Sequence, residues 1–348
     1  MNVYTQKYNQ IIYRSVFIIA MIVFTFFASP AKAYTPQFSQ FFAAPLYLAP
    51  SFAGATDGSR VILNYRNQWP SLPGTFVTYS FAFDHYFHDY NSGIGLMLFR
   101  DQAGSSNLST TNAGLLYSYN FNIDRNWTIR PGLHFIYSQR NIDYSQFLFA
   151  DQINLDGNDA GSTITSFEME RVSYFDASFS VLAHTQSTWF GASVDHLMTP
   201  DQSVTNTTSS MPLKISAFGG YRFQLQGGLG GISDEFVTLN ALFKNQGSFN
   251  QLDVGGYWSK EPLSFGLLYR GVLVFNNPIY GNYNNDALVL MTAFRRENIR
   301  VGYSYDFTIS NLGGATGGSH ELSIIYHFNQ QEGGTRCPLG DCPYSPYQ

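Results

Sequence analysis

The sequence predicts an all-β protein, a transmembrane antiparallel up-and-down β-barrel of about fourteen strands. Charged residues make up only 12% of the chain, about half the usual share, while aromatic residues reach 17%. Mean hydropathy is nevertheless near zero, at −0.13, and after residue 33 no apolar run approaches the length of a membrane-spanning helix. Many segments instead alternate apolar or aromatic residues with polar ones, so that one face of each can contact lipid.

The first 33 residues are predicted to be a signal peptide rather than part of the fold. Lys7 and Arg14 precede an apolar run at 15–27, and Ala31-Lys32-Ala33 supplies the small residues of a cleavage site. The mature chain is therefore expected to begin at Tyr34 and to reach the outer membrane. It would carry 16 Lys and Arg against 24 Asp and Glu, a net charge of −8, and so lacks the basic face that nucleic acids require.

Alternation with a period of two predicts the strands. It is clearest near the C-terminus, where Ile299, Val301 and Tyr303 begin an apolar face and Arg300 begins the polar face. Strands are expected at 60–68, 75–87, 92–100, 109–122, 127–139, 173–184, 188–197, 212–224, 236–245, 249–259, 263–273, 286–296, 299–309 and 319–329. Each is close to the ~9–11 residues that a tilted membrane strand needs.

The connections between these strands also indicate a barrel. With the first strand starting in the periplasm, most long connections fall outside and most short ones in the periplasm; the exceptions are 225–235 and 246–248. A soluble β-sandwich, the alternative fold, would need neither this order nor aromatic residues on nearly every strand. The expected organisation is a signal peptide at 1–33, a periplasmic or plug-like segment at 34–58, the barrel at 59–329 and a periplasmic tail at 330–348.

Charged residues recur on the face predicted to line the lumen. They are Asp84, Arg130, Asp176, Lys214, Arg222, Lys244, Asp253, Arg270, Arg300 and Asp306. They could line a charged channel or a docking cavity for a translocating chain. Alternatively, opposite charges could pair in a filled interior. The mixed signs favour the filled interior, because a selective pore tends to carry one sign.

The two ends of the mature chain are candidate docking elements. Segment 34–58 is rich in aromatic residues and Pro and shows no strand period, so it could plug the lumen, dock a periplasmic partner or simply tether the first strand. In the tail, Cys337 and Cys342 could form a small disulfide loop in the oxidising periplasm. That loop could dock a partner or belong to an inert tail.

The sequence predicts no enzyme, cofactor or metal site. It contains no nucleophile elbow, HExxH motif or P-loop. A serine hydrolase built into the barrel wall is the enzymatic alternative, and the histidines available to it are His134, His184, His196 and His327. Single histidines at strand ends are more often lumen or interface residues.

Five sequence motifs are spread along the mature chain. They are Pro36-Gln37-Phe38-Ser39-Gln40; Pro45-Leu46-Tyr47-Leu48-Ala49-Pro50-Ser51-Phe52-Ala53-Gly54; Tyr65-Arg66-Asn67-Gln68-Trp69; Asp195-His196-Leu197-Met198-Thr199-Pro200; and Pro212-Leu213-Lys214 with Gly220-Tyr221-Arg222-Phe223. In this order they resemble the PorP/SprF family of type IX secretion system outer-membrane proteins. Ala44 and Ala49 depart from the family, which tends to carry Asn there.

This resemblance implies a non-enzymatic role in the type IX secretion system of Bacteroidetes. Family members assist export or surface attachment of large adhesins and gliding motility, or anchor the periplasmic ring through a peptidoglycan-binding lipoprotein. The expected partners are therefore outer-membrane lipid, secretion machinery, that lipoprotein and adhesin cargo. The candidate docking residues are Pro36, Gln37, Phe38, Leu46, Tyr47, Leu48, Pro50, Cys337 and Cys342. A porin-like diffusion channel for small solutes is the alternative function.

Overall fold

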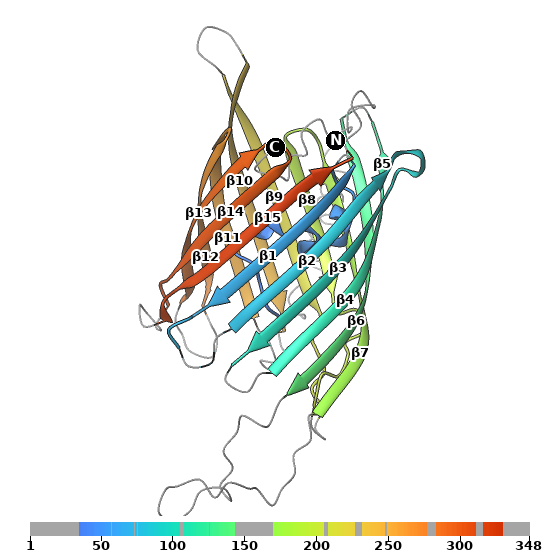
Figure 1. Cartoon of the computed structure of the whole chain (residues 1–348), viewed down its shortest axis with the longest axis vertical. Helices are drawn as coiled ribbons and strands as arrows, with labels where there is room; N and C mark the ends of the chain where they lie inside the picture. Colours follow the sequence, from blue (N-terminus) through green and yellow to red (C-terminus); the bar gives the residue numbers. More distant parts are fainter. Residues whose placement is uncertain are drawn as a thin grey trace, which may run out of the picture.

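The fold is a closed ring of fourteen antiparallel strands (Figure 1), as predicted. The computed structural model describes residues 35–329 except 57, 73, 75, 105–107, 125, 143–169, 205–207, 227–231, 248, 277–282 and 311–315. The wall strands are β1 (Ser59–Gln68), β2 (Phe76–Phe87), β3 (Ser92–Ala103), β4 (Leu108–Tyr119), β6 (Thr128–Ile142), β7 (Glu170–His184), β8 (Thr188–Asp195), β9 (Lys214–Gln226), β10 (Ile232–Gln246), β11 (Phe249–Lys260), β12 (Leu263–Asn276), β13 (Tyr283–Arg296), β14 (Ile299–Thr308) and β15 (Ser319–Phe328). The two-residue β5 (Phe121–Asn122) pairs with β6 beside the end of β4.

The ring closes where the first strand meets the last. β1 and β15 pair along their whole length, from Ser59 opposite Phe328 to Gln68 opposite Ser319, and β4 pairs with β6 across the short β5. Closure matters because water is absent from the bilayer core, so each strand must satisfy its backbone groups with a neighbour. No helix in the described part of the chain is long and apolar enough to span a bilayer.

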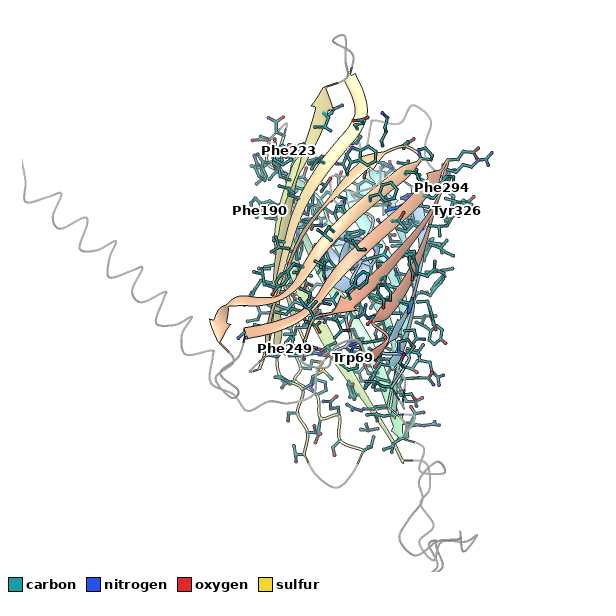
Figure 2. The ribbon with its side chains drawn as sticks, turned by 90° about the vertical axis from the view of Figure 1, so that its left-hand side faces the viewer. Trp69, Phe190, Phe223, Phe249, Phe294 and Tyr326 are labelled. Carbon is teal, nitrogen blue, oxygen red and sulfur yellow. The ribbon has the colours of Figure 1, made fainter. Side chains whose placement is uncertain are left out.

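The two faces of the wall differ as the alternation predicts. In β14, Ile299, Val301 and Tyr303 are exposed on the outside, whereas Ser304 and Asp306 are buried on the inside. Large exposed side chains from other strands follow the same rule, and Figure 2 shows them standing out from the wall: Phe190, Phe223, Phe294 and Tyr326. The outer surface therefore presents apolar and aromatic groups to lipid.

Several strands extend further than the sequence indicated. β10 begins at Ile232 rather than 236, and β9 continues to Gln226, so the connection expected at 225–235 shortens to 227–231. β6 and β7 likewise extend beyond the predicted ends at 139 and 173. The added residues are largely polar. Strand ends that lie outside the bilayer do not contact lipid, so their sequence need not alternate between apolar and polar residues.

We name the two ends of the barrel by their connections. The long-loop end carries residues 143–169, between β6 and β7, and the short-turn end carries 185–187, between β7 and β8. Three short helices lie before β1, namely η1 (Phe41–Ala43), α2 (Pro45–Leu48) and η2 (Pro50–Phe52), and a fourth, η3 (His88–Tyr90), joins β2 to β3. Figure 1 shows the helices that precede β1 inside the ring.

Candidate functional site: the filled lumen

Residues 35–56, which we call the lumen segment, cross the interior of the barrel lengthwise. At the long-loop end, the Thr35 hydroxyl donates to Gln246 Oε1 at 2.8 Å. Near the short-turn end, the Gly54 N–H donates to Asp84 Oδ2 at 2.8 Å. The segment therefore enters the lumen from the long-loop end and leaves it at the short-turn end to begin β1. The sequence did not indicate this direction.

The sequence of the lumen segment suits a narrow interior. Pro45 and Pro50 occupy the first position of α2 and η2, where the missing N–H has no helical partner and the fixed φ favours a helix start. Small residues between the helices are fully buried, among them Ala43 and Ala53. Ala44 and Ala49, where the family tends to carry Asn, are buried too, so they leave no side-chain amide to satisfy.

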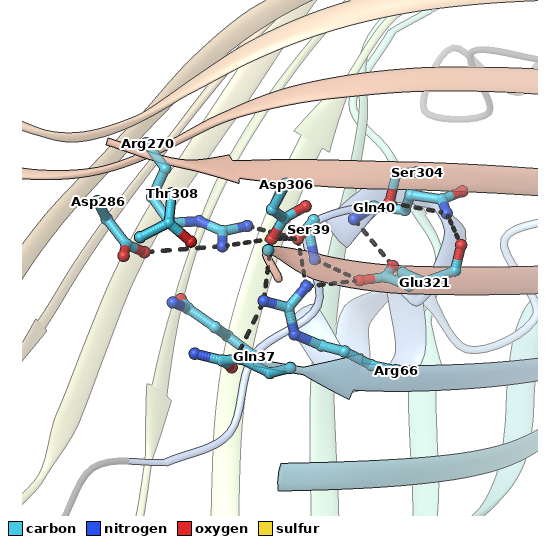
Figure 3. A network of polar contacts seen from close by, with 12 residues as sticks. Gln37, Ser39, Gln40, Arg66, Arg270, Asp286, Ser304, Asp306, Thr308 and Glu321 are labelled. Atoms are coloured by element: carbon cyan, nitrogen blue, oxygen red, sulfur yellow. Dashed lines mark hydrogen bonds and ion pairs between the residues drawn. The ribbon is translucent and has the colours of Figure 1, made fainter. Parts of the chain in front are cut away.

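A buried ionic cluster holds the segment near the long-loop end (Figure 3). The Glu321 carboxylate accepts hydrogen bonds from the N–H groups of Ser39 at 2.7 Å and Gln40 at 3.0 Å. The Ser39 hydroxyl donates to Asp306 at 2.6 Å. Arg66 pairs with Asp306 at 2.9 Å and with Glu321 at 3.3 Å. The segment thus supplies donors that two buried carboxylates need.

Arg270 extends this cluster to the next strands. It pairs with Asp306 at 3.1 Å and Asp253 at 3.5 Å. Its guanidinium also donates to the Ser39 hydroxyl at 2.8 Å. Lys244 lies 3.7 Å from Asp253 and donates to the Gln37 side chain at 3.0 Å. Opposite charges here satisfy one another away from bulk water, and the lumen segment completes their hydrogen bonds.

A second polar anchor lies near the short-turn end. Arg60 pairs with Asp84 at 2.9 Å, and the same carboxylate accepts the Gly54 N–H. Arg130 donates to the carbonyl oxygens of Ser51 at 3.1 Å and Ala53 at 2.6 Å. All three ionisable side chains are almost fully buried. Through these side chains, backbone N–H and C=O groups of the segment are hydrogen-bonded to the barrel wall.

Two glycines allow the backbone of the segment to lie directly against the wall. A Cβ at Gly93 would lie 2.0 Å from the Ala53 carbonyl oxygen, and a Cβ at Gly132 would lie 2.3 Å from the Ser51 nitrogen. No real Cβ approaches backbone atoms so closely. Neither glycine could be identified from the sequence, because nothing local to β3 or β6 marks the contact.

Between the two anchors the lumen is apolar. Phe42 packs edge-on against Tyr257 with ring centroids 4.4 Å apart, and Phe52 lies 5.4 Å from Phe218. Leu46 is fully buried in the same cluster. Inward-facing apolar side chains of the wall surround it: Ile62, Leu116, Leu182, Leu242, Leu268 and Ile325. The alternation in the sequence indicated polar residues on the lumen face, and it did not indicate this apolar middle layer.

The other predicted lumen charges lie apart from the two anchors. Asp176 binds His196 at 2.6 Å, and Lys214 binds Asp195 at 3.0 Å. Arg222 lies over the Phe236 ring at 5.2 Å. Arg300 on β14 is buried, as are Asp176 and Arg222, whereas Lys214 is half-buried.

The predicted docking residues within the lumen segment face the interior. Phe38, Leu46 and Pro50 are buried, and Tyr47 stacks on Phe99 at 5.0 Å. Pro36, Gln37 and Leu48 are half-buried. A partner would reach the three buried residues only if the segment left the lumen, whereas Pro36 and Tyr47 line a cavity. Cys337 and Cys342 lie outside the described residues.

The histidines considered for a hydrolase are spread over different strands. His134, His184 and His327 belong to β6, β7 and β15. His196 has a carboxylate partner, Asp176, and lies 3.4 Å from the Thr35 hydroxyl, but that hydroxyl donates to Gln246. Within the described ranges, no three His, Cys, Asp or Glu side chains are placed to hold a metal ion.

Comparison with known proteins gives one family. The family described as "Type IX secretion system membrane protein PorP/SprF" matches residues 31–326. A comparison with curated proteins finds no match. Among solved structures, the Pseudomonas putida toluene transporter TodX is 10% identical over 87% of this chain and 97% of its own, with a TM-score of 0.49. The Acinetobacter baumannii outer membrane protein Omp33 is 9% identical over 79% and 100% of the two chains, with a TM-score of 0.46.

Proposed function

This chain belongs to the PorP/SprF family of type IX secretion system membrane proteins, and we propose that it acts there as a closed outer-membrane scaffold. In this role it is not an enzyme and not a conduit. It assists the export or surface attachment of secreted adhesins, and through them gliding motility. Its long-loop end meets the exported protein, and its short-turn end and C-terminal tail meet secretion machinery or a peptidoglycan-binding lipoprotein in the periplasm.

The observation that carries this proposal is the occupied lumen. The lumen segment fills the apolar middle of the barrel and is anchored at both ends by buried ion pairs. Removing it would leave Glu321 and Asp84 without the N–H groups that they now accept, which is costly for buried carboxylates. A filled barrel of this kind favours docking on its surfaces over passage through its centre.

Planar-bilayer recording of the purified protein tests the closed state. We expect no steady ohmic conductance across the inserted barrel. A large, constant conductance would instead support the porin-like alternative, because it would require an open water-filled lumen.

A deletion strain of the source bacterium tests the role in secretion. We expect exported surface proteins to be lost from the cell surface and restored by the wild-type chain. Normal export in the deletion strain would refute the secretion role, whatever the conductance.

A further inference from the structure

One wall strand is left partly unpaired on one side. β7 pairs with β6 along its full length, from Glu170 to His184. On its other side it pairs with β8 only from Phe179 to His184. β8 is the shortest wall strand and ends at Asp195. Residues 171–177 of β7, which we call the β7 edge, therefore extend past the end of their neighbour at the long-loop end.

The motif Asp195–Pro200 causes β8 to end there. His196 adopts a positive φ of 63°, which turns the chain out of the strand direction. Its ring is bound to Asp176 at 2.6 Å, and Asp195 is bound to Lys214 on β9 at 3.0 Å. The Leu197 N–H donates to the Ala177 carbonyl at 3.0 Å, and this is the last backbone bond to β7; the next N–H, that of Met198, donates to the Asp176 side chain at 3.4 Å.

The β7 edge offers a row of free backbone groups. The bond from Leu197 to the Ala177 carbonyl shows that odd-numbered residues point their peptide groups toward this side, because the direction alternates along a strand. Arg171, Ser173 and Phe175 therefore present N–H and C=O groups, and no described residue bonds to them there. A free edge of this kind is a template for another strand.

A cavity of about 160 Å³ lies on the lumen side of the β7 edge. Its lining includes residues of β7 and residues at the end of β8. Four polar atoms in its wall have neither a hydrogen-bond nor an ion-pair partner among the described residues: Asn112 Oδ1, His134 Nε2, Arg140 Nε and Gln202 Nε2. Arg140 Nε and Gln202 Nε2 are donors, Asn112 Oδ1 is an acceptor, and His134 Nε2 is one or the other according to its tautomer. Tyr174, whose side chain also lines the cavity, lies on the inward face of β7. A strand added to the edge would thus point alternate side chains toward the cavity.

We infer that the β7 edge binds an extended segment of an exported polypeptide as an added strand, with one amide-bearing side chain entering the cavity. An amide both accepts and donates, and so matches the unsatisfied atoms there. This inference rests on the proposed function, which brings exported protein to the long-loop end.

A second copy of this chain does not fit the edge. Two barrels inserted the same way up are related by rotation about the membrane normal, so their β7 strands run in the same direction across the bilayer. Each strand of such a barrel is tilted by roughly 35–45°, so the two edges would cross at a wide angle rather than pair.

A photoreactive amino acid at residue 173 or 175, in the full chain in its native membrane, tests the inference. After irradiation, we expect each probe to form an adduct with the same exported protein. Mass spectrometry should place the two attachment points two residues apart in one segment, as strand pairing requires. Adducts confined to residues 143–169 of this chain, or no adduct, would overturn the inference.

The matched pair Ser173→Pro and Ser173→Ala isolates the backbone contribution. Proline removes the N–H that faces the open side and leaves the ladder to β6 intact, whereas alanine keeps that N–H. With the probe at residue 175, we expect Ser173→Pro to lower adduct yield about tenfold and Ser173→Ala to leave it unchanged. Equal yields from folded barrels would refute strand addition, and the deletion strain would still report separately on the secretion role.

Discussion

Gly132→Ala should displace the lumen segment from the wall. The added Cβ would lie 2.3 Å from the Ser51 nitrogen and 2.5 Å from the Pro50 carbonyl carbon. Both are backbone atoms, so no side-chain rotation relieves the overlap. Restoring an ordinary contact of 3.4 Å at Ser51 requires a movement of about 1.1 Å.

That movement strains two hydrogen bonds in addition to the packing. The Ser51 N–H donates to the Ser180 hydroxyl at 2.8 Å, and Arg130 donates to the Ser51 carbonyl at 3.1 Å. Overpacking costs about 1–3 kcal/mol, and each weakened hydrogen bond adds about 0.5–1.5 kcal/mol. We expect a total loss of about 2–6 kcal/mol.

Urea unfolding of the barrel in lipid vesicles measures this loss, and planar-bilayer recording detects an opened lumen. Gly219→Ala is the control, because its Cβ would approach only wall atoms, the nearest being the Trp189 carbonyl oxygen at 3.0 Å. We expect transient conductance from Gly132→Ala and none from Gly219→Ala. If the two variants had the same stability and neither showed conductance, the close contact between the lumen segment and the wall would be refuted.

Three further outcomes are expected. Arg66→Met removes the cation paired with buried Glu321 and one of those paired with buried Asp306, and should cost about 3–5 kcal/mol in urea unfolding. Arg295→Met breaks an ion pair with the exposed Glu261 and should cost about 0–1 kcal/mol; similar losses in the two variants would contradict the anchoring role of the cluster. Leu290→Arg places a charge on the outer face of β13 and should cost about 2–4 kcal/mol in vesicles, and no loss would argue against lipid contact there. An epitope tag placed immediately before Thr35 should bind antibody on intact cells, because the segment enters from the long-loop end, and a tag reached only after permeabilisation would reverse the assigned orientation.

The wall of the barrel could be predicted because its determinants are local. In β14, alternation between exposed and buried residues sets both the strand and its inward face, and the predicted range 299–309 differs from Ile299–Thr308 by one residue. The same signal failed at the polar ends of β6, β7 and β10, because it depends on lipid contact and those ends have none.

The organisation of the lumen could be predicted only in part. Asp306 and Arg270 were identified as lumen charges because they alternate with apolar residues. Their shared contact with Ser39 was not foreseen, because Ser39 lies 267 residues from Asp306 in the sequence. No local pattern reports such a contact, or the direction in which three short helices cross the barrel.

The ionic cluster at Ser39 also has a consequence for biogenesis. Arg66 stands on the first wall strand and Glu321 on the last, and both bind Ser39, which precedes them in synthesis. If β1 and β15 paired while the lumen was still empty, Glu321 would be buried without the N–H groups of Ser39 and Gln40 that it now accepts. We therefore expect the lumen segment to lie between β1 and β15 before the insertion machinery lets these two strands pair and close the barrel.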